Sequence, residues 1–364
     1  MIGIGTGRSM SKMLEETRQQ PAALARTLDE GLATLNELRQ QFETKPPRLV
    51  VLVARGTSDN AAQFGRYLIE ITARIPVSLA APSIVTLYES PVDLTNVLVV
   101  GISQSGESTD TNAVLEDARR RGAATVGITN EPRSRLARIA ERVLLARAGR
   151  EESVAATKTY TCQLMTLYLL AFALGAPVSL EVLRRLPEWV DRVLDLEERI
   201  GEIAERYTFM SRAVTVGRGL NYANALELGL KLMETCYVVA ERFSPADLMH
   251  GPIALVERSF PVFVFAPSGV TWTSISALLD RLEDLKAETL VITDEGNPEA
   301  ASKPARLIQL PLTAAGEDSA EGPRDLYTAI PYIVPAQLFA ASLAEQKGLN
   351  PDQPRALSKV TRTL

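Results

Sequence analysis

The sequence predicts an α/β protein made of two parallel-sheet domains related by internal duplication. Short apolar runs alternate with helical patterns along most of the chain, which is typical of parallel βαβ units whose sheets are covered on both faces. The second half also repeats motifs that end strands in the first half, at a nearly constant spacing. With 364 residues the chain has room for two domains of ordinary size.

The expected elements follow one another along the chain. Residues 13–44 carry spaced apolar side chains among many charges, which indicates an amphipathic helix, and Pro46-Pro47 should end it. Apolar runs then indicate strands at 49–54, 77–80, 97–102, 125–129 and 142–145, and in the second half at 212–216, 261–266, 289–293 and 307–310. We therefore expect a helical lead-in at 13–48, domains at 49–190 and 205–345, and a C-terminal tail at 346–364.

The duplication rests on three pairs of matching positions. Two pairs are spaced by 163 residues and one by 164: Arg55-Gly56 with Arg218-Gly219, Ser105-Gly106 with Ser268-Gly269, and Thr129-Asn130 with Thr293-Asp294. The second half has Ala266 and Pro267 where the first has Ser103 and Gln104, so two polar side chains are missing from the copy. We therefore expect one ligand site for each pair of domains.

Composition and charge argue against several classes of protein. The net charge is −5, and no Lys/Arg-rich run with interleaved aromatics occurs, so nucleic-acid binding is not expected. Cys162 and Cys236 lie in apolar helical surroundings without CxxC spacing, which argues against a disulfide framework or a zinc site. The N-terminus has no secretory signal pattern, and no uncharged apolar stretch reaches about 18 residues. We expect a cytoplasmic protein without a membrane span, metal ion or cofactor.

A phosphate-binding loop is indicated at residues 99–111, where an apolar strand runs into hydroxyl side chains. Ser103, Ser105 and Ser108 can each donate a hydrogen bond, Gly106 allows backbone N–H groups to approach an anion, and a helix begins near Thr109. Neither GxxxxGK[ST] nor GxGxxG is present, so a monophosphate fits better than a nucleotide.

A second loop at 54–60 follows another apolar strand and offers Thr57 and Ser58. The loops at the carboxyl ends of neighbouring parallel strands converge on one crevice, so both loops should contact the same ligand. The alternative is that these hydroxyls only cap the helices that follow. A third segment, 151–161, brings small residues before a helix, and we assign its Lys158 no catalytic role.

Acid-base residues are expected in the second half. Glu227, Lys231 and Glu234 are spaced i, i+4 and i+7, so they share one helix face. A solvated ion-pair ladder is the alternative, but the surrounding leucines favour partial burial. His250, the only histidine, titrates near neutrality and suits the opening of a pyranose ring, although a lone histidine can be incidental. Lys359 lies in the tail, which could equally be disordered.

Seven motifs, taken in order and spacing, resemble the double sugar-isomerase (SIS) region of glucosamine-6-phosphate synthase and its relatives, among them the SIS-type glucosamine-6-phosphate deaminases. The resemblance spans nearly the whole chain. The motifs are KMLEETRQQP (12–21), RGTSD (55–59), SQSGES (103–108), SVAATKTYT (153–161), ALELGLKLMET (225–235), HGPIAL (250–255) and PRALSK (354–359).

The resemblance implies two flavodoxin-like SIS subdomains and a role for each motif. It implies that Glu234 moves a proton between C1 and C2, that His250 opens the sugar ring from the neighbouring subunit of a homodimer, and that Lys359 forms a Schiff base with a ketose. Lys231 and Glu227 would line the same pocket, which the tail would close. The residues implied to bind the substrate and its phosphate are Gly56, Thr57, Ser58, Ser103, Gln104, Ser105, Gly106, Ser108, Val154 and Ala155.

Departures from the synthase narrow the expected reaction. Ser108 replaces a Thr and keeps the hydroxyl, whereas Ala156 replaces a Ser and loses a donor. The SIS pattern begins by Met13 without a glutaminase domain before it, so we expect no ammonia derived from glutamine. The expected function is therefore deamination of glucosamine 6-phosphate to fructose 6-phosphate. Alternatives are a glutaminase-lacking synthase-like isomerase, a deglycase of fructosamine phosphates, and a sugar-phosphate sensor without catalytic activity.

Overall fold

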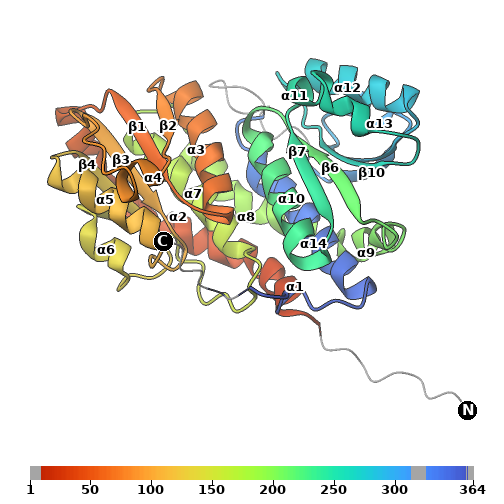
Figure 1. Cartoon of the computed structure of the whole chain (residues 1–364), viewed down its shortest axis with the longest axis horizontal. Helices are drawn as coiled ribbons and strands as arrows, with labels where there is room; N and C mark the ends of the chain where they lie inside the picture. The colour runs from red at the N-terminus through yellow and green to blue at the C-terminus, as the bar shows by residue number, and fades with distance from the viewer. Residues whose placement is uncertain (1–9, 313–324, 358, 360–364) are drawn as a thin grey trace, which may run out of the picture.

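The computed structural model describes residues 10–312, 325–357 and 359. The predicted tail therefore lies partly outside the described residues, at 358 and 360–364. Figure 1 shows two parallel sheets side by side, with helices on their faces and a layer of helices between them. The α/β prediction and the two-sheet architecture are confirmed.

The first sheet is formed by the five strands predicted for the first half. They are β1 (Leu49–Val53), β2 (Val77–Leu79), β3 (Val97–Ile102), β4 (Ala124–Thr129) and β5 (Arg142–Leu145), all parallel, in the order β2-β1-β3-β4-β5. The connecting helices are α3 (Thr57–Thr72), α4 (Ser83–Thr86), α5 (Thr109–Arg120) and α6 (Arg135–Ile139), and α7 (Lys158–Ala173) follows β5. This is the strand order of flavodoxin-like sheets.

The second sheet repeats that order with one strand that the sequence pattern missed. Its strands are β6 (Arg212–Val216), β7 (Val239–Phe243), β8 (Pro261–Phe265), β9 (Glu288–Asp294) and β10 (Arg306–Leu310), in the order β10-β9-β8-β6-β7. When the strands are numbered within their own half and read from β7, the order is 2-1-3-4-5, as in the first sheet. We did not predict β7 because it is an edge strand carrying Glu241 and Arg242, so it lacks the apolar run of a strand buried on both faces.

The helices of the second half match those of the first. After β6 come the short helix η1 (Gly219–Asn221) and α10 (Tyr222–Cys236), in the position of α3. They are followed by α11 (Pro245–Met249), η2 (Pro252–Leu255), α12 (Trp272–Asp284) and α13 (Pro298–Ala301). The C-terminal helix α14 (Ala329–Gln346) takes the place of α7.

The predicted lead-in helix is two helices, α1 (Lys12–Arg18) and α2 (Gln20–Thr44). They meet at Gln19, two residues before Pro21, whose missing N–H is tolerated only in the first turn of a helix. The second helix ends at Thr44, two residues before Pro46, as expected. The two halves are joined by α8 (Leu180–Leu194) and α9 (Glu197–Glu205).

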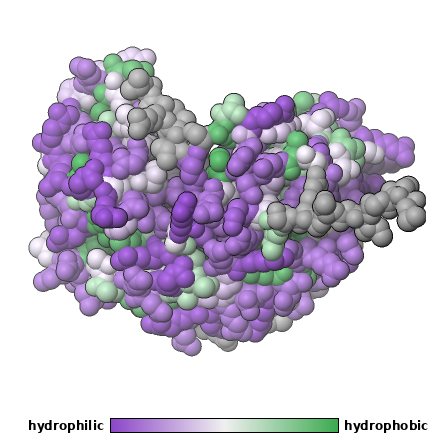
Figure 2. Space-filling view, turned by 90° about the horizontal axis from the view of Figure 1, so that it is seen from below, coloured by the Kyte–Doolittle hydropathy of each residue, from purple (hydrophilic) through white to green (hydrophobic). Residues whose placement is uncertain are grey.

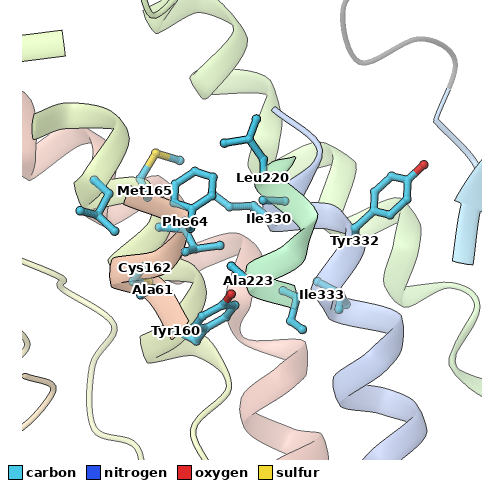
Figure 3. Packing of buried hydrophobic residues seen from close by; sticks show 14 of the residues in the cluster. Ala61, Phe64, Tyr160, Cys162, Met165, Leu220, Ala223, Ile330, Tyr332 and Ile333 are labelled. Carbon is cyan, nitrogen blue, oxygen red and sulfur yellow. The ribbon is translucent and has the colours of Figure 1, made fainter. Parts of the chain in front are cut away.

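One continuous hydrophobic core lies between the sheets and joins the two halves. Almost every residue of α7 and α14 is buried, so neither helix has the alternating polar face of a surface helix. Figure 3 shows side chains of this core from several elements: Ala61 and Phe64 of α3, Tyr160, Cys162 and Met165 of α7, Leu220 of η1, Ala223 of α10, and Ile330 and Ile333 of α14. Each large apolar side chain buried here contributes about 2 kcal/mol.

A buried hydrogen bond ties the halves together within this core. The Tyr160 hydroxyl donates to Asn224 Oδ1 at 3.2 Å, and Asn224 Nδ2 donates to the Ala329 carbonyl at 2.8 Å. Helices α7, α10 and α14 are therefore held in one arrangement by directional contacts as well as by packing. Because α10 also packs on α3, the helix carrying Glu227, Lys231 and Glu234 lies against the first half of the chain.

One face of the molecule is mostly hydrophilic, and both cysteines are buried. The face in Figure 2 is mostly hydrophilic with small separate hydrophobic areas, and within the described residues no helix has the length and apolar character needed to span a membrane. Cys162 and Cys236 are free and buried, and burial raises the pKa of the Cys162 thiol to about 12 and that of Cys236 to about 11. Both thiols are therefore protonated and unreactive at neutral pH.

Candidate active site

A cavity of about 340 Å³ lies at the carboxyl ends of β1 and β3, where the strand order of the first sheet reverses. In open α/β sheets this reversal leaves a crevice between the two outgoing connections, and ligands bind there. The lining comes from both halves of the chain and from the tail: Arg55, Gly56, Thr57, Ser58, Ser103, Gln104, Ser105, Ser108, Val154, Ala156, Lys231, Glu234 and Lys359.

The loop after β1 contributes hydroxyls that already have protein partners. Gly56 has φ +58° and precedes the first residue of α3, so the chain turns sharply there and brings Thr57 and Ser58 to the cavity. Thr57 donates its hydroxyl hydrogen to Glu227 Oε1 at 3.0 Å, and Ser58 Oγ accepts from Gln163 Nε2 at 2.9 Å. These contacts orient both hydroxyls, and both residues line the cavity.

The loop after β3 turns tightly at Gly106. Gly106 has φ +66°, its N–H donates to Ser103 Oγ at 3.1 Å, and a Cβ at this position would lie 2.1 Å from Ser134 Oγ. A side chain here would therefore clash as well as strain the backbone. Gly106 itself lies behind the lining, whereas Ser103, Gln104, Ser105 and Ser108 line the cavity.

The helix-capping alternative does not describe these loops. Ser108 is the N-cap residue of α5, yet its side chain accepts no capping hydrogen bond from the helix backbone, and the N-cap position of α3 is Gly56. Ser108 Oγ instead accepts from Thr111 Oγ1 at 3.1 Å and remains at the cavity. The hydroxyl hydrogen of Ser108 is thus directed away from Thr111 and can be donated to an anion at the helix N-terminus.

The predicted acid-base cluster forms on α10 and is buried rather than solvated. Lys231 Nζ lies 2.5 Å from Glu234 Oε2 and 3.4 Å from Glu227 Oε1, and the side chains of Lys231 and Glu227 are 1% and 0% exposed. Glu227 also accepts from Asn60 Nδ2 at 2.7 Å, so it lies behind the cavity lining and ties α10 to α3. Lys231 and Glu234, with 24% of the Glu234 side chain exposed, reach the cavity.

Electrostatics keep Lys231 charged. Burial acts to lower the pKa of Lys231, but the carboxylates of Glu227 and Glu234 outweigh burial, and the net shift is upward. Burial raises the pKa of Glu227, opposed by Lys231 and by the hydrogen bond from Asn60. Lys231 is thus an ammonium donor throughout the neutral range, and it cannot accept a proton there.

The segment before α7 is held by a buried carboxylate that the sequence analysis did not single out. Glu151 is fully buried and accepts from the Thr157 N–H at 2.9 Å, from Thr159 Oγ1 at 2.6 Å and from Lys359 Nζ at 3.1 Å. Burial acts to raise the pKa of Glu151, but Lys359 and these hydrogen bonds outweigh it, and the net pKa is lowered. No motif or spacing pointed to Glu151, since its charged partner Lys359 lies 208 positions away in the tail.

The tail reaches back across the molecule to the first half. Asp352 accepts from the backbone N–H groups of Lys12 and Met13 at 2.8 Å each, and the Arg355 N–H donates to the Tyr237 hydroxyl at 2.9 Å. Beyond these contacts, Lys359 donates to Glu151 and to the Ser153 carbonyl at the edge of the cavity. Val154 and Ala156 line the cavity, whereas Ala155, which was predicted to bind the substrate, is fully buried and is not among the lining residues.

The predicted residue His250 lies away from the cavity, and so does Lys158, to which we assigned no catalytic role. His250 is exposed at the C-terminal cap of α11 and is not among the lining residues of its own chain. Lys158 is buried and donates to Gln19 Oε1 at 2.6 Å and to the Arg150 carbonyl, which is a structural role. No group of three His, Cys, Asp or Glu side chains among residues 10–312 and 325–357 is placed to hold a metal ion.

At the equivalent loops of the second half, a buried carboxyl side chain packs against the two glycines. Asp325 is 3% exposed and packs against Gly219 and Gly269, the counterparts of Gly56 and Gly106. A methyl group on Gly219 would lie 3.9 Å from Asp325 Oδ2, and one on Gly269 would lie 3.4 Å from Asp325 Cβ. A carboxyl side chain thus takes up space at the second pair of loops.

The family follows from comparison of the whole chain with known proteins. The family model of the SIS domain matches residues 45–173 and again 210–343, which are the segments that contain the two sheets. The chain belongs to the SIS domain family. The two SIS matches also correspond to the duplication expected from the motif spacing.

The curated SIS relatives include larger enzymes. Glutamine--fructose-6-phosphate aminotransferase [isomerizing] of Pyrococcus horikoshii is 37% identical over 358 residues, covering 95% of this chain and 57% of the relative. The protein of the same name from Aquifex aeolicus is 35% identical over 349 residues, with the same coverage. This chain therefore spans a little over half the length of these relatives.

Solved SIS structures have the same fold. The C-terminal domain of glucosamine-fructose-6-phosphate aminotransferase from Francisella tularensis aligns with a TM-score of 0.85 at 28% identity, covering 96% of this chain and 100% of that one. The glucosamine-6-phosphate deaminase from Thermotoga maritima aligns with a TM-score of 0.75 at 24% identity, covering 97% and 100%. At that identity the second likeness concerns the fold alone.

Proposed function

We propose that this SIS protein is a phosphosugar isomerase/deaminase that converts glucosamine 6-phosphate into fructose 6-phosphate and ammonia. One observation carries the proposal: Glu234, hydrogen-bonded to a charged Lys231, lines the same cavity as the hydroxyls of the β1 and β3 loops. A carboxylate that could act as a general base therefore lines the same cavity as an anion cradle.

The proposed reaction begins with the sugar phosphate held by the two loops. Ser103, Ser105 and Ser108 would donate hydrogen bonds to the 6-phosphate, and the N-terminus of α5 favours its negative charge. The other end of the open-chain aldose would then reach Glu234. The aldehyde at C1 and the amine at C2 would lie between this carboxylate and Lys359.

Glu234 would carry out the isomerisation. Its carboxylate takes the C2 proton while O1 gains a proton, which gives an enaminol, and protonation at C1 then gives a C2 imine. Water adds to this imine at C2. The C2–N bond then breaks, which releases ammonia and leaves fructose 6-phosphate as the product. Lys231 stays protonated because of its raised pKa, so it orients Glu234 and stabilises charge rather than serving as the base.

His250 would complete the site from a second copy of the chain. It is exposed, lies on the loop after β7 and is absent from the cavity of its own chain, and Met249 and Leu255 beside it are 43% and 54% exposed. An exposed apolar surface next to an exposed imidazole fits a subunit contact that buries both. We propose a homodimer in which the partner's His250 opens the sugar ring.

The test measures ammonia released from glucosamine 6-phosphate and compares the protein with its Glu234→Gln variant. The proposal predicts release by the unaltered protein and a loss of about 10²–10⁴-fold in kcat in the variant, which is the usual range for removal of a general base. Turnover in D₂O should also place deuterium at C1 of fructose 6-phosphate. Ammonia release no faster than that of the variant would rule out the deaminase.

Identity to the aminotransferases favours a second candidate, an isomerase that makes glucosamine 6-phosphate from fructose 6-phosphate and a nitrogen donor. The same Glu234 would move the proton in the opposite direction. Supplying fructose 6-phosphate with ammonium or with glutamine separates the two. Formation of glucosamine 6-phosphate, without ammonia release in the reverse assay, would favour this candidate over the deaminase.

A further inference from the structure

Three cations line the cavity among the described residues, and each of them has a carboxylate partner. Lys231 is between Glu227 and Glu234, and Lys359 donates to Glu151 and to the Ser153 carbonyl. Arg55 is the third, at the end of β1 and directly before the turn at Gly56. Among the described residues, its guanidinium has more N–H donors without a protein partner than either lysine has.

Arg55 is held by one carboxylate oxygen of Asp110. Its Nε lies 3.0 Å and its Nη2 2.5 Å from Asp110 Oδ2. A guanidinium carries five N–H donors in a planar fork, so the remaining ones have no protein partner among the described residues. The Arg55 side chain is 52% exposed at the cavity, whereas Asp110 is 7% exposed in the first turn of α5.

Asp110, the partner of Arg55, lies where its negative charge would act on an anion bound in the cradle. Asp110 and the cradle loop share the N-terminal end of α5, so the Asp110 charge would oppose a phosphate bound there. The hydroxyls of the cradle are neutral and cannot offset either charge. Arg55 joins the loop of β1 to the first turn of α5, and can pair with Asp110 and with an incoming phosphate at the same time.

We propose that Arg55, oriented by Asp110, is a specificity-determining residue that pairs with the 6-phosphate of the substrate and selects its dianion. This inference rests on the proposed sugar-phosphate function, and it adds a cationic ligand to a cradle that the sequence motifs assigned to uncharged groups. Unphosphorylated sugars gain nothing from Arg55, so the residue separates a hexose phosphate from the free hexose.

The experiment measures the affinity for fructose 6-phosphate, fructose and inorganic phosphate by calorimetry, and KM and kcat for glucosamine 6-phosphate, in four proteins. These are the unaltered chain, Arg55→Gln, the double variant Arg55→Gln/Asp110→Asn, and Arg66→Gln. Arg66 is the matched control, since it is an exposed arginine on α3 paired with Glu70 at 3.8 Å and away from the cavity. Thermal melts of each variant establish that it is folded.

Arg55→Gln is expected to weaken fructose 6-phosphate binding and raise KM by about 10- to 100-fold, since a charge-assisted hydrogen bond is lost, while kcat changes little. Fructose affinity should stay the same, and Arg66→Gln should match the unaltered protein. In the unaltered chain KM should rise as pH falls below about 6, where the phosphate monoester gains a proton. This rise should be smaller in Arg55→Gln.

The double variant distinguishes phosphate binding from simple neutralisation of Asp110. If Arg55 contacts the phosphate, removing the Asp110 charge does not restore affinity. Restored affinity, or unchanged affinity in Arg55→Gln, would overturn the inference. If the unaltered chain binds fructose 6-phosphate through Arg55 but releases no ammonia, the deaminase function is ruled out and the role of Arg55 is supported. If the chain binds neither fructose 6-phosphate nor inorganic phosphate, the deaminase function and the role of Arg55 are both ruled out.

Discussion

Lys231 donates a 2.5 Å hydrogen bond from Nζ to Glu234 Oε2, one turn further along α10. The lysine is buried and the glutamate reaches the cavity, so the pair connects the core between the two halves to the proposed reaction centre. Removal of either the ammonium or the carboxylates would leave an uncompensated charge in the core, which destabilises the fold. This mutual dependence leads to the first prediction.

Replacing Lys231 by Met should destabilise the protein by about 3–5 kcal/mol, because the Glu227 carboxylate would stay buried without its ion pair. The measurement is the free energy of unfolding from urea denaturation. Lys12→Met is the matched control, since Lys12 pairs with Glu15 at the same i, i+3 spacing but with both side chains about half exposed. That variant should lose less than about 1 kcal/mol. Equal losses in the two variants would contradict the buried ion pair.

Glu151→Gln should weaken the protein in a pH-dependent way. The pKa of Glu151 in the folded chain is below its ordinary value of 4.5, so its charged form contributes stability that is complete above 4.5 and is lost as pH falls through the lowered pKa. The free energy of unfolding of the variant should therefore lie below that of the unaltered chain at pH 7. The gap should close in acid.

The control for Glu151 is Glu43→Gln, which removes an exposed carboxylate paired with Arg39 on α2. Its effect on the free energy of unfolding should stay within about 0.5 kcal/mol, as for most surface substitutions. A gap between Glu151→Gln and the unaltered chain that stays constant down to acid would mean that Glu151 acts only through packing.

Gly106→Ala should weaken fructose 6-phosphate binding by at least about tenfold, because a hydrogen-bond donor displaced by a fraction of an ångström contributes little. The added methyl would lie 2.1 Å from Ser134 Oγ, so the loop carrying Ser103 and Ser108 must move. Gly122→Ala is the control, since Gly122 also has a positive φ, +79°, but nothing lies within 4 Å of the added methyl. Both variants carry backbone strain of about 1 kcal/mol. Only the first should lose ligand affinity in calorimetry.

His250→Ala and Glu234→Gln should each be inactive alone and active when mixed. In a homodimer with shared sites, random exchange of subunits gives about a quarter of the original activity, because half the dimers are mixed and each has one complete site. The measurement is ammonia release after co-refolding the two variants. A mixture as inactive as either variant would argue that His250 acts within its own chain or has no part in the reaction.

Much of this molecule could be predicted from the chain because local patterns were strong. The strands buried on both faces appear as apolar runs, and Pro46 ends α2 close to where predicted. The spacing of Glu227, Lys231 and Glu234 placed them on one face, since helix geometry alone decides this. The repeated Gly positions also predicted a second set of loops, where Gly219 has nearly the same φ as Gly56.

Elements exposed on one side were harder to predict. β7 lies at the sheet edge and carries Glu241 and Arg242, so it has no continuous apolar run from which a strand could be predicted. The lead-in is two helices because Pro21 restricts the chain at one point within an otherwise unbroken amphipathic pattern.

The sequence by itself determined the two α/β halves, the hydroxyl loops and the helix bearing Glu234, because each depends on residues near one another in the chain. Only the tertiary structure decided that Glu151 holds Lys359, that Asp110 orients Arg55, and that Asp325 packs against Gly219 and Gly269. The residues in these contacts lie at least 55 positions apart in the sequence. No local pattern encodes such contacts, because they arise only when the packed sheets and helices bring distant charges together at the end of a strand or helix.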